Sequence, residues 1–338
     1  MKTLIKIILG LFLLVVLLVV GELVYEYVYD HRKPNFSQEA VVYVWPDMSP
    51  ATVVDSIAVK AGVRNRESLV RAFHSSGTPQ PGRYIITPSM TSEAAARKIM
   101  NGWEDEMNLV IAPVYRTVDS LAVKVAAQLM LSPEDLSAAL KDRDILARYG
   151  LQPETALALI LPDTYRVKWS VSVEDLLDRL YKEYQKYWNE ERRAKAEKQG
   201  LTPVEAAILA SIVNEETKYQ PEMAKVAGVY LNRLHTPGWL LQADPTVAFC
   251  FGYSLKRVLN KHLEYDSPYN TYKYEGLPPG LISCAPKVCI EAVLNPSAEP
   301  NFYFCASPAL DGTHRFARTN AQHEANARAY RNAISKKK

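Results

Sequence analysis

An unbroken apolar segment near the N-terminus constrains this chain more than any other feature. Residues 4–20 read LIKIILGLFLLVVLLVV, with Lys6 as the only charge, and apolar residues continue to position 24. A run of this length matches a helix that crosses the hydrocarbon core of a bilayer. A cleaved signal peptide is the alternative, because Lys2 and Lys6 form a basic start. The segment is longer than a signal core and lacks a small-x-small cleavage site, so we expect a retained anchor over residues 1–29.

The charges around the anchor predict its orientation. Both lysines precede the apolar segment, which favours a cytoplasmic N-terminus and an extracytoplasmic position for the rest of the chain. The whole sequence of 338 residues is long enough for two folded domains besides the anchor. A net charge of +3, without a concentrated basic stripe, argues against nucleic acid as a partner.

Four cysteines fall in about the last quarter of the chain: Cys250, Cys284, Cys289 and Cys305. An extracytoplasmic location permits disulfides, and four cysteines allow three pairings. Their spacing is not C-x-x-C, and no histidine pair completes a zinc pattern. We therefore expect structural cysteines, either free or paired, and no metal site.

Residue patterns divide the remainder into a stalk and two folded parts of α+β class. Residues 30–40 are polar and predict a short stalk. Residues 41–106 have a β-α-turn-β-α order, which by fold analogy resembles a small carbohydrate-binding module of the LysM type. A larger mixed α/β domain over residues 107–338 would include an amphipathic helix at 170–188. The sequence leaves open whether the small module binds glycan.

One helix of the larger domain is the strongest candidate for carrying chemistry. Thr202-Pro203-Val204-Glu205 combines a threonine cap, an early proline and a glutamate three residues after the cap. At about 100° per residue, Glu216 projects near the centre of the helix's apolar face, whereas Glu215 lies nearer its edge. Burial favours the protonated form of a carboxyl group, as a general acid requires. Periodicity alone slightly favours the alternative, in which both glutamates leave the core at the helix C-terminus.

Seven segments together reverse that preference because of their order and spacing. They are LPDTY (161–165), ASIVNEET (210–217), VAGVYLNRL (226–234), LQADPTV (241–247), SPYNTY (267–272), GLPPGLIS (276–283) and DGTHRFART (311–319). The chain resembles the endolytic murein transglycosylases, the MltG/YceG-like family, over nearly its whole length. The family's catalytic glutamate, the second in a motif close to ASIVEKET, falls on Glu216. Its first glutamate is Asn214 here and its lysine is Glu215. The chain also departs from the family at 157–161, where LALIL replaces a polar element.

Several polar and aromatic residues are candidates for substrate binding. They are Asn232, Gln242, Asp244, Tyr269, Asn270 and Tyr272. Gln242 and Asp244 have two equally favoured interpretations: hydrogen bonds to sugar groups, or capping of the following helix, with Pro245 biasing Asp244 away from helix. We expect Arg233 to be a surface charge or part of an internal ion pair, and His314 and His323 to be ordinary polar or capping residues.

The resemblance implies a lyase without a metal or organic cofactor. Its substrate would be the peptidoglycan glycan strand, cut internally between N-acetylmuramic acid and N-acetylglucosamine to leave 1,6-anhydromuramyl ends. Glu216 would serve as both acid and base. The implied setting is the bacterial inner membrane, where the enzyme would end nascent strands beside penicillin-binding synthases. Two alternatives stay open: a lysozyme-like hydrolase with Asp244 or Asp163 as second carboxylate, and a non-catalytic peptidoglycan-binding scaffold.

Overall fold

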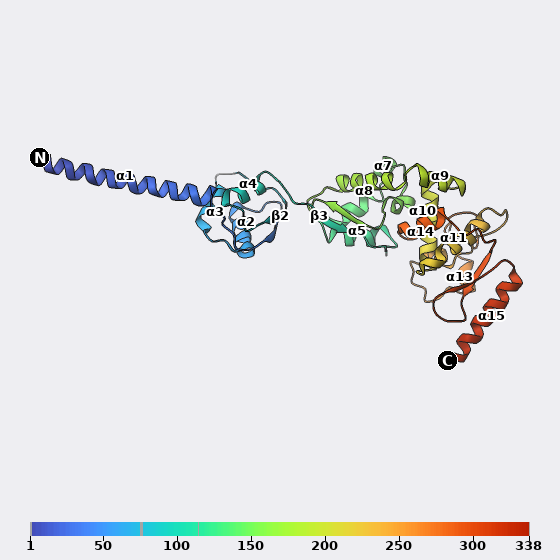
Figure 1. Cartoon of the computed structure of the whole chain (residues 1–338). Coiled ribbons are helices and arrows are strands. Elements are labelled where there is room, and N and C mark those ends of the chain that lie inside the picture. The colour runs from blue at the N-terminus through green and yellow to red at the C-terminus, as the bar shows by residue number, and fades with distance from the viewer. Residues whose placement is uncertain (1, 75–76, 114, 338) are drawn as a thin grey trace. The chain divides into compact units, whose positions relative to one another are not determined.

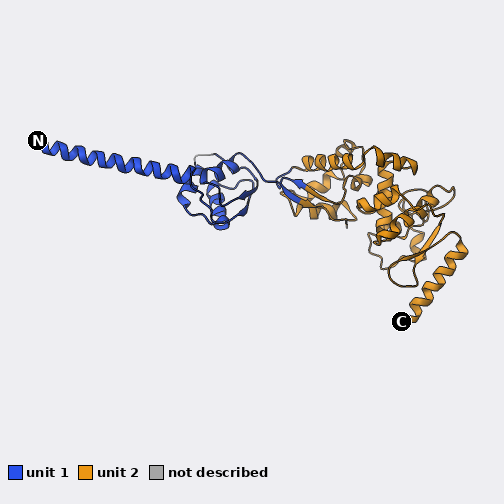
Figure 2. Cartoon of the chain, in the orientation of Figure 1, with its two compact units in different colours: residues 1–108, 166–171 blue, residues 109–165, 172–338 orange. Residues whose placement is uncertain are grey.

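The computed structural model describes residues 2–74, 77–113 and 115–337. The chain forms two compact units (Figure 2): unit 1 comprises Met1–Asn108 and Arg166–Val171, and unit 2 comprises Leu109–Tyr165 and Ser172–Lys338. Both units mix helices and strands, in agreement with the α+β class predicted from the sequence.

Unit 1 begins with a long apolar helix, α1, over Lys2–His31 (Figure 1). Its 30 residues span about 45 Å at 1.5 Å per residue, more than the roughly 30 Å of a bilayer's hydrocarbon core. The candidate membrane span, Thr3–His31, has a mean hydropathy of 3.1 over its most apolar window, and none of that window is buried. By length and composition, α1 is therefore a candidate membrane-spanning helix, as predicted.

The segment predicted as a polar stalk differs from that expectation. Helix α1 extends through its first two residues, and Asn35 and Phe36 are buried in unit 1. The Asn35 amide donates to the Asn65 carbonyl oxygen and to Ser92 Oγ, at 2.7 and 2.8 Å. Because polar residues surround Phe36 in the sequence, the segment was predicted to be exposed. The Phe36 side chain instead packs in the core of unit 1.

The core of unit 1 lies between one strand pair and three helices. Strands β1 (Ala40–Val44) and β2 (Gly82–Ile86) pair antiparallel, with Val42 opposite Tyr84. The other elements are α2 (Pro50–Ile57), the π-helical turn η1 (Ala58–Gly62), α3 (Arg66–His74) and α4 (Ser92–Met100). The strands, α2 and α4 had been predicted, whereas α3 had not. The likeness to a LysM module stays a prediction.

Unit 2 is mainly helical. Strands β3 (Met107–Val110) and β4 (Thr164–Val167) form a two-stranded sheet, and unit boundaries fall within both. The following elements are α5 (Val118–Ala126), α6 (Pro133–Ala139), α7 (Arg143–Ala147), the 3-10 helix η2 (Pro153–Leu159), α8 (Val173–Tyr187), α9 (Glu190–Lys198), α10 (Pro203–Glu216), α11 (Gln220–Leu234), α12 (Asp244–Cys250), α13 (Asn260–Leu263) and α14 (Lys287–Leu294). Strands β5 (Tyr303–Ala306) and β6 (His314–Ala317) and helix α15 (Asn320–Lys337) complete the chain.

Helix α10 is the central element of unit 2. The predicted capping box is present: Thr202 Oγ1 accepts from the Glu205 N–H, and the Glu205 carboxylate accepts from the Thr202 N–H. Helices α11, α12 and α14 pack around it, and every residue from Ala206 to Asn214 is buried. The sequence predicted a single apolar stripe, but α10 is surrounded on nearly all sides. Its C-terminal residue, Glu216, therefore emerges from the interior of unit 2.

Candidate active site

Glu216 is held by a tyrosine from the neighbouring helix. Helix α10 ends at Glu216, because the backbone of Thr217 is extended, with φ −142° and ψ 140°. The hydroxyl of Tyr230, buried on α11, donates a hydrogen bond of 2.5 Å to Glu216 Oε1. This bond fixes one carboxyl oxygen. No described residue forms a hydrogen bond with Oε2, which can exchange a proton with another group.

Burial sets the protonation of Glu216. Desolvation raises the pKa of its carboxyl from 4.5 to about 7, although the Tyr230 hydrogen bond opposes this shift. The charge of Asp244 raises the pKa further, while Arg233 lowers it. A carboxyl group with a pKa near 7 can both donate and accept a proton close to neutral pH, which is the property of a general acid–base group.

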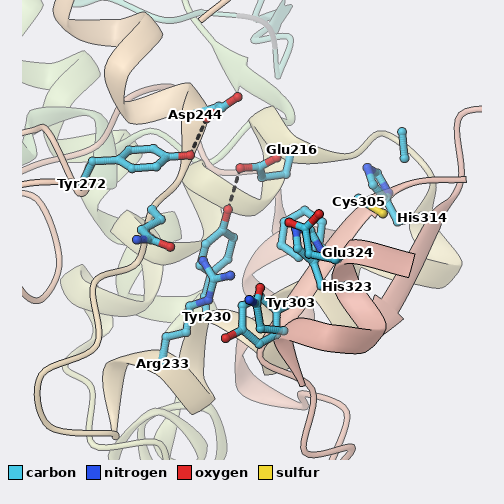
Figure 3. Close-up of a pocket in the computed structure, with 14 residues that line it drawn as sticks. Glu216, Tyr230, Arg233, Asp244, Tyr272, Tyr303, Cys305, His314, His323 and Glu324 are labelled. Atoms are coloured by element: carbon cyan, nitrogen blue, oxygen red, sulfur yellow. Dashed lines mark hydrogen bonds between the residues drawn. The ribbon is translucent and has the colours of Figure 1, made fainter. Parts of the chain in front are cut away.

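Glu216 lines a pocket of about 510 Å³ (Figure 3). Its walls come from helices α10 and α11, from the segment between α11 and α14, and from the C-terminal elements β5, β6 and α15. The lining residues are Glu216, Tyr230, Arg233, Gln242, Asp244, Tyr272, Tyr303, Phe304, Cys305, Ala306, His314, Asn320, His323 and Glu324. Aromatic faces and hydrogen-bonding groups therefore surround one carboxyl, a combination that suits a polar ligand with ring faces.

Three of the predicted binding residues lie in this pocket with Glu216. Gln242 is exposed at its rim and has a left-handed backbone, with φ 52°. Tyr272 donates to Asp244 Oδ1 at 2.6 Å. Asp244 is the first residue of α12, so the expectation that Pro245 would keep it out of a helix was wrong; a proline is tolerated in the first turn, where the N–H needs no helical partner. The N-cap of α12 is Ala243, and among the described residues no side chain forms a capping bond there, so neither Gln242 nor Asp244 has the capping role.

The other three predicted binding residues do not line this pocket, and they contact other residues of unit 2. The Asn232 amide donates to the carbonyl oxygens of Glu299 and Asn301, and Asn232 lines a separate pocket. Asn270 is fully buried, donates to two loop carbonyls and accepts from the Tyr272 N–H. The Tyr269 ring packs against Phe249, with centroids 4.6 Å apart. These side chains shape unit 2 around the pocket.

Two buried residues of α11 line the pocket and were not predicted to do so. Tyr230 is buried, and its hydroxyl reaches Glu216. Arg233 is neither exposed nor, among the described residues, ion-paired: it is 6% exposed and donates to the carbonyl oxygens of Phe302 and Leu241. From the sequence alone, a tyrosine and an arginine at these helical positions would be taken as residues of the protein interior. Only the chain segments that pack beside α11 show that both line the pocket.

His314 and His323 were also expected to be ordinary polar or capping residues, but both line the pocket. The His323 ring stacks on Tyr303 with centroids 5.3 Å apart, and its Nδ1 is buried without a partner among the described residues. Burial lowers the pKa of His323. His314 Nδ1 lies 3.0 Å from a carboxylate oxygen of Glu222.

Two other acidic residues, Glu215 and Asp163, do not line this pocket. Arg116 forms hydrogen bonds of 2.7 and 3.0 Å to Glu215 Oε2, and the Glu215 side chain is 8% exposed. Asp163, considered above as a second carboxylate, is paired with Lys287 and does not line the pocket. Asp244 is thus the only one of the two proposed second carboxylates that shares the pocket with Glu216.

The sequence profile of the YceG-like family matches residues 42–329, which include every residue of the pocket. The chain belongs to the YceG-like family.

Proteins similar to this family member include two bacterial enzymes. The endolytic murein transglycosylase of Bacillus subtilis (strain 168) is 27% identical over 296 residues, which cover 82% of this chain and 81% of the relative. The endolytic murein transglycosylase of Streptococcus pneumoniae serotype 2 (strain D39 / NCTC 7466) is 24% identical over 340 residues. That match covers 88% of this chain but 59% of the longer streptococcal protein.

The fold is also similar to a solved member of the YceG-like group. The crystal structure of a putative yceG-like protein from Listeria monocytogenes aligns with a TM-score of 0.56 and 26% identity. The alignment covers 85% of this chain and 98% of the Listeria chain. Leu157 to Leu161, where this sequence departs from the family pattern it was compared with, are all buried in unit 2 and do not line the pocket.

Proposed function

We propose that this chain is an endolytic lytic transglycosylase of peptidoglycan, and that Glu216 is its acid–base group. The observation that carries the proposal is the Glu216 carboxyl itself, with a pKa near 7 and one oxygen held by Tyr230 inside a pocket lined by polar and aromatic groups. The names of the bacillary and streptococcal relatives support the reaction class.

The first half of the reaction uses Glu216 as an acid. Protonated Oε2 gives its proton to the glycosidic oxygen that links N-acetylmuramic acid to N-acetylglucosamine. The bond between that oxygen and the muramyl anomeric carbon breaks, and its electron pair stays on the departing oxygen. Positive charge then develops at the anomeric carbon while the Glu216 carboxylate becomes negative. Tyr230 stabilises this ionised form because it donates to Oε1.

The second half uses the same carboxylate as a base. Glu216 takes the proton of the muramyl C6 hydroxyl, whose oxygen bonds to the anomeric carbon of the same sugar. The products are a free glycan end and a 1,6-anhydromuramyl end, and no water is consumed. Glu216 regains its proton, so one carboxyl completes the cycle without a second catalytic carboxylate or a cofactor.

A lysozyme-like hydrolase is the second candidate, and one observation favours it. Asp244 lies in the same pocket as Glu216, and its charge raises the pKa of Glu216. Two carboxyl groups flanking one sugar bond are the usual equipment of a hydrolase. In this protein, however, Asp244 accepts from the Tyr272 hydroxyl at 2.6 Å, which commits one of its oxygens to the protein.

The test is mass spectrometry of purified glycan strands treated with the full-length chain in detergent. Internal cuts with anhydromuramyl ends support the proposal, whereas products heavier by one water support the hydrolase. Glu216→Gln should abolish cutting. Glu215→Gln is the matched control, because it changes the adjacent glutamate that pairs with Arg116 outside the pocket, and it should retain most of the activity. Binding of glycan by wild type without any cutting would favour the scaffold.

The setting of the enzyme is also part of the proposal. We place α1 across the bacterial inner membrane with its N-terminus in the cytoplasm, which puts the pocket outside the cytoplasm beside its substrate. The proposed role is to end nascent strands near the membrane, with penicillin-binding synthases as partners. Residues 41–106 act in this proposal as a LysM-like module, and residues 107–338 as the catalytic domain.

A further inference from the structure

His314 is oriented by a carboxylate that the proposed reaction does not use. Glu222, in the first turn of α11, is 9% exposed. Both of its oxygens accept from the His314 backbone N–H, at 3.0 and 3.1 Å, and Oε2 also lies 3.0 Å from the ring Nδ1. A carboxylate can only accept hydrogen bonds, so the ring nitrogen that lies beside Glu222 must donate. Nδ1 of His314 therefore carries the hydrogen.

This pairing fixes the chemistry of the other ring nitrogen. In the neutral ring, a hydrogen on Nδ1 makes Nε2 an acceptor. No described residue forms a hydrogen bond with Nε2, and Nε2 is not among the buried side-chain atoms that lack a partner. In the neutral form of the ring, Nε2 is therefore an accessible acceptor with a fixed direction.

The ring is also held in place by its packing. Strand β6 pairs with β5, with His314 opposite Ala306. The ring meets Phe304 edge to face, with centroids 5.5 Å apart, and Phe304 in turn meets Tyr230 at 5.8 Å. Figure 3 shows Glu216 between the Tyr272–Asp244 pair on one side and His314 with Cys305 on the other. His314 thus belongs to the same pocket as Glu216, on a different wall.

We propose that His314 is a substrate-binding residue whose Nε2 accepts a hydrogen bond from a sugar hydroxyl or acetamido N–H, with Glu222 as its positioning residue. The proposal rests on the proposed function, because that function supplies the glycan as ligand. A neutral acceptor suits these donors and does not suit a carboxylate. The purely structural alternative is that His314 only ties β6 to α11 through Glu222.

Two substitutions separate these roles because each retains one ring nitrogen's function. In His314→Asn, the amide N–H₂ can take the place of Nδ1 and keep the bond to Glu222, but nothing replaces Nε2. In His314→Gln, the longer amide reaches the place of Nε2 and offers an acceptor, while the bond from Nδ1 is lost. His74→Asn, an exposed histidine of unit 1, is the control for the substitution itself.

The first measurement is the binding of N-acetylglucosamine oligomers and purified glycan strands to the full chain in detergent. It is made in a Glu216→Gln background, so that the ligand stays uncut. His314→Asn should weaken binding about tenfold, as expected for one lost hydrogen bond, with an unchanged melting temperature. His314→Gln should retain binding better than His314→Asn, even if its melting temperature falls. In an active background, His314→Asn should raise KM and leave kcat nearly unchanged.

The opposite pattern overturns the proposal. If His314→Asn binds as tightly as its parent, and only His314→Gln loses both binding and thermal stability, then the histidine is structural. Absence of glycan binding by the Glu216→Gln protein also overturns it. A failure of wild type to cut strands would instead reject the transglycosylase function, and the binding comparison would still decide the role of His314.

Discussion

Two tyrosine hydroxyls hold the two carboxylates at the upper part of the pocket in Figure 3. Tyr230 donates to Glu216 Oε1 at 2.5 Å, and Tyr272 donates to Asp244 Oδ1 at 2.6 Å. Burial raises the pKa of Tyr230 well above its ordinary value, and it also raises that of Tyr272. Both phenols therefore keep their hydrogens and remain donors over the pH range in which Glu216 titrates. The two pairs differ in their neighbours, since Glu216 is desolvated and Asp244 is exposed.

Loss of the Tyr230 hydroxyl should shift the pH dependence of activity. In Tyr230→Phe, the ionised form of Glu216 loses a donor, so the pKa of Glu216 rises further and the alkaline limb of kcat/KM moves to higher pH. Because the carboxyl is also less well oriented, we expect the maximum rate to fall about tenfold, the equivalent of roughly 1.4 kcal/mol. The measurement is a pH profile of strand cleavage.

Tyr187→Phe is the control for this experiment, because it removes a buried hydroxyl that bonds Glu291 outside the pocket. It should leave the pH profile in place. An alkaline limb that does not move in Tyr230→Phe would contradict the assignment of that limb to Glu216.

Glu216 should also make stability depend on pH. Its pKa is about 7 when folded and 4.5 ordinarily, so between these values the unfolded chain releases a proton that the folded chain keeps. Folding stability therefore falls as pH rises from about 4.5 to about 7. Glu216→Gln lacks this loss and should be more stable than wild type at pH 8, by up to about 3 kcal/mol.

Thermal unfolding of both proteins between pH 4 and 8 measures this difference. Comparison of the two chains cancels the other titrating groups, because they are common to both. A difference in melting temperature that stays constant across this range would show that the folded pKa of Glu216 is not raised.

At the scale of elements, the sequence predicted what depends on local pattern. Helix α10 followed from its capping box and apolar spacing, and the amphipathic pattern over 170–188 predicted α8. The β5–β6 pair and α15 were not predicted, although they form one wall of the pocket. Each strand has only four residues, and Glu222, which His314 of β6 contacts, lies 92 residues away in the sequence. Short strands carry little periodicity, so only tertiary packing fixes their place.

The turn at 276–280 is fixed by close approach to the 3-10 helix η2. A Cβ on Gly280 would lie 1.9 Å from the Glu154 carbonyl oxygen, which accepts from the Leu281 N–H at 3.2 Å. Because the obstacle is backbone, Gly280→Ala must displace one chain segment, and we expect a loss of about 3 kcal/mol of folding stability. Denaturant unfolding measures the change.

Gly276, in the same turn, is the matched control. Its φ is +82°, and a Cβ there would meet nothing within 4 Å. Gly276→Ala should therefore cost only the left-handed backbone strain of an alanine, about 1 kcal/mol. Equal losses at the two positions would mean that the contact with η2 costs no more than left-handed backbone strain, because Gly280, unlike Gly276, has no positive φ.

At the scale of the whole molecule, α1 is continuous with unit 1. Arg71 of α3 pairs with Asp30 at 2.9 Å and with Glu26 at 3.2 Å, both on the last turns of α1. A polar stalk would have separated the anchor from the first folded unit, as the sequence suggested. The structure instead gives one helix that starts as an apolar rod and ends against the helices of unit 1. A cleaved signal peptide would not be expected to share ion pairs with the mature fold.

Retention of α1 as a membrane anchor is a prediction that can be tested in the intact cell. The full chain should stay in the membrane pellet after an alkaline carbonate wash, and its N-terminal peptide should still contain the apolar segment 4–24. A chain lacking residues 4–24 should be recovered in the soluble fraction, because it has lost the only helix of the described residues that can span a bilayer.

A C-terminal alkaline phosphatase fusion tests the direction of the same helix. The enzyme needs an oxidising compartment for its disulfides, so the full-length fusion should be active and the fusion lacking 4–24 inactive. A full-length fusion that is membrane-bound but inactive would place the Glu216 pocket in the cytoplasm, away from peptidoglycan. A soluble, active protein without its N-terminal peptide would identify 4–24 as a cleaved signal, and the contacts of Arg71 with α1 would then be absent from the mature enzyme.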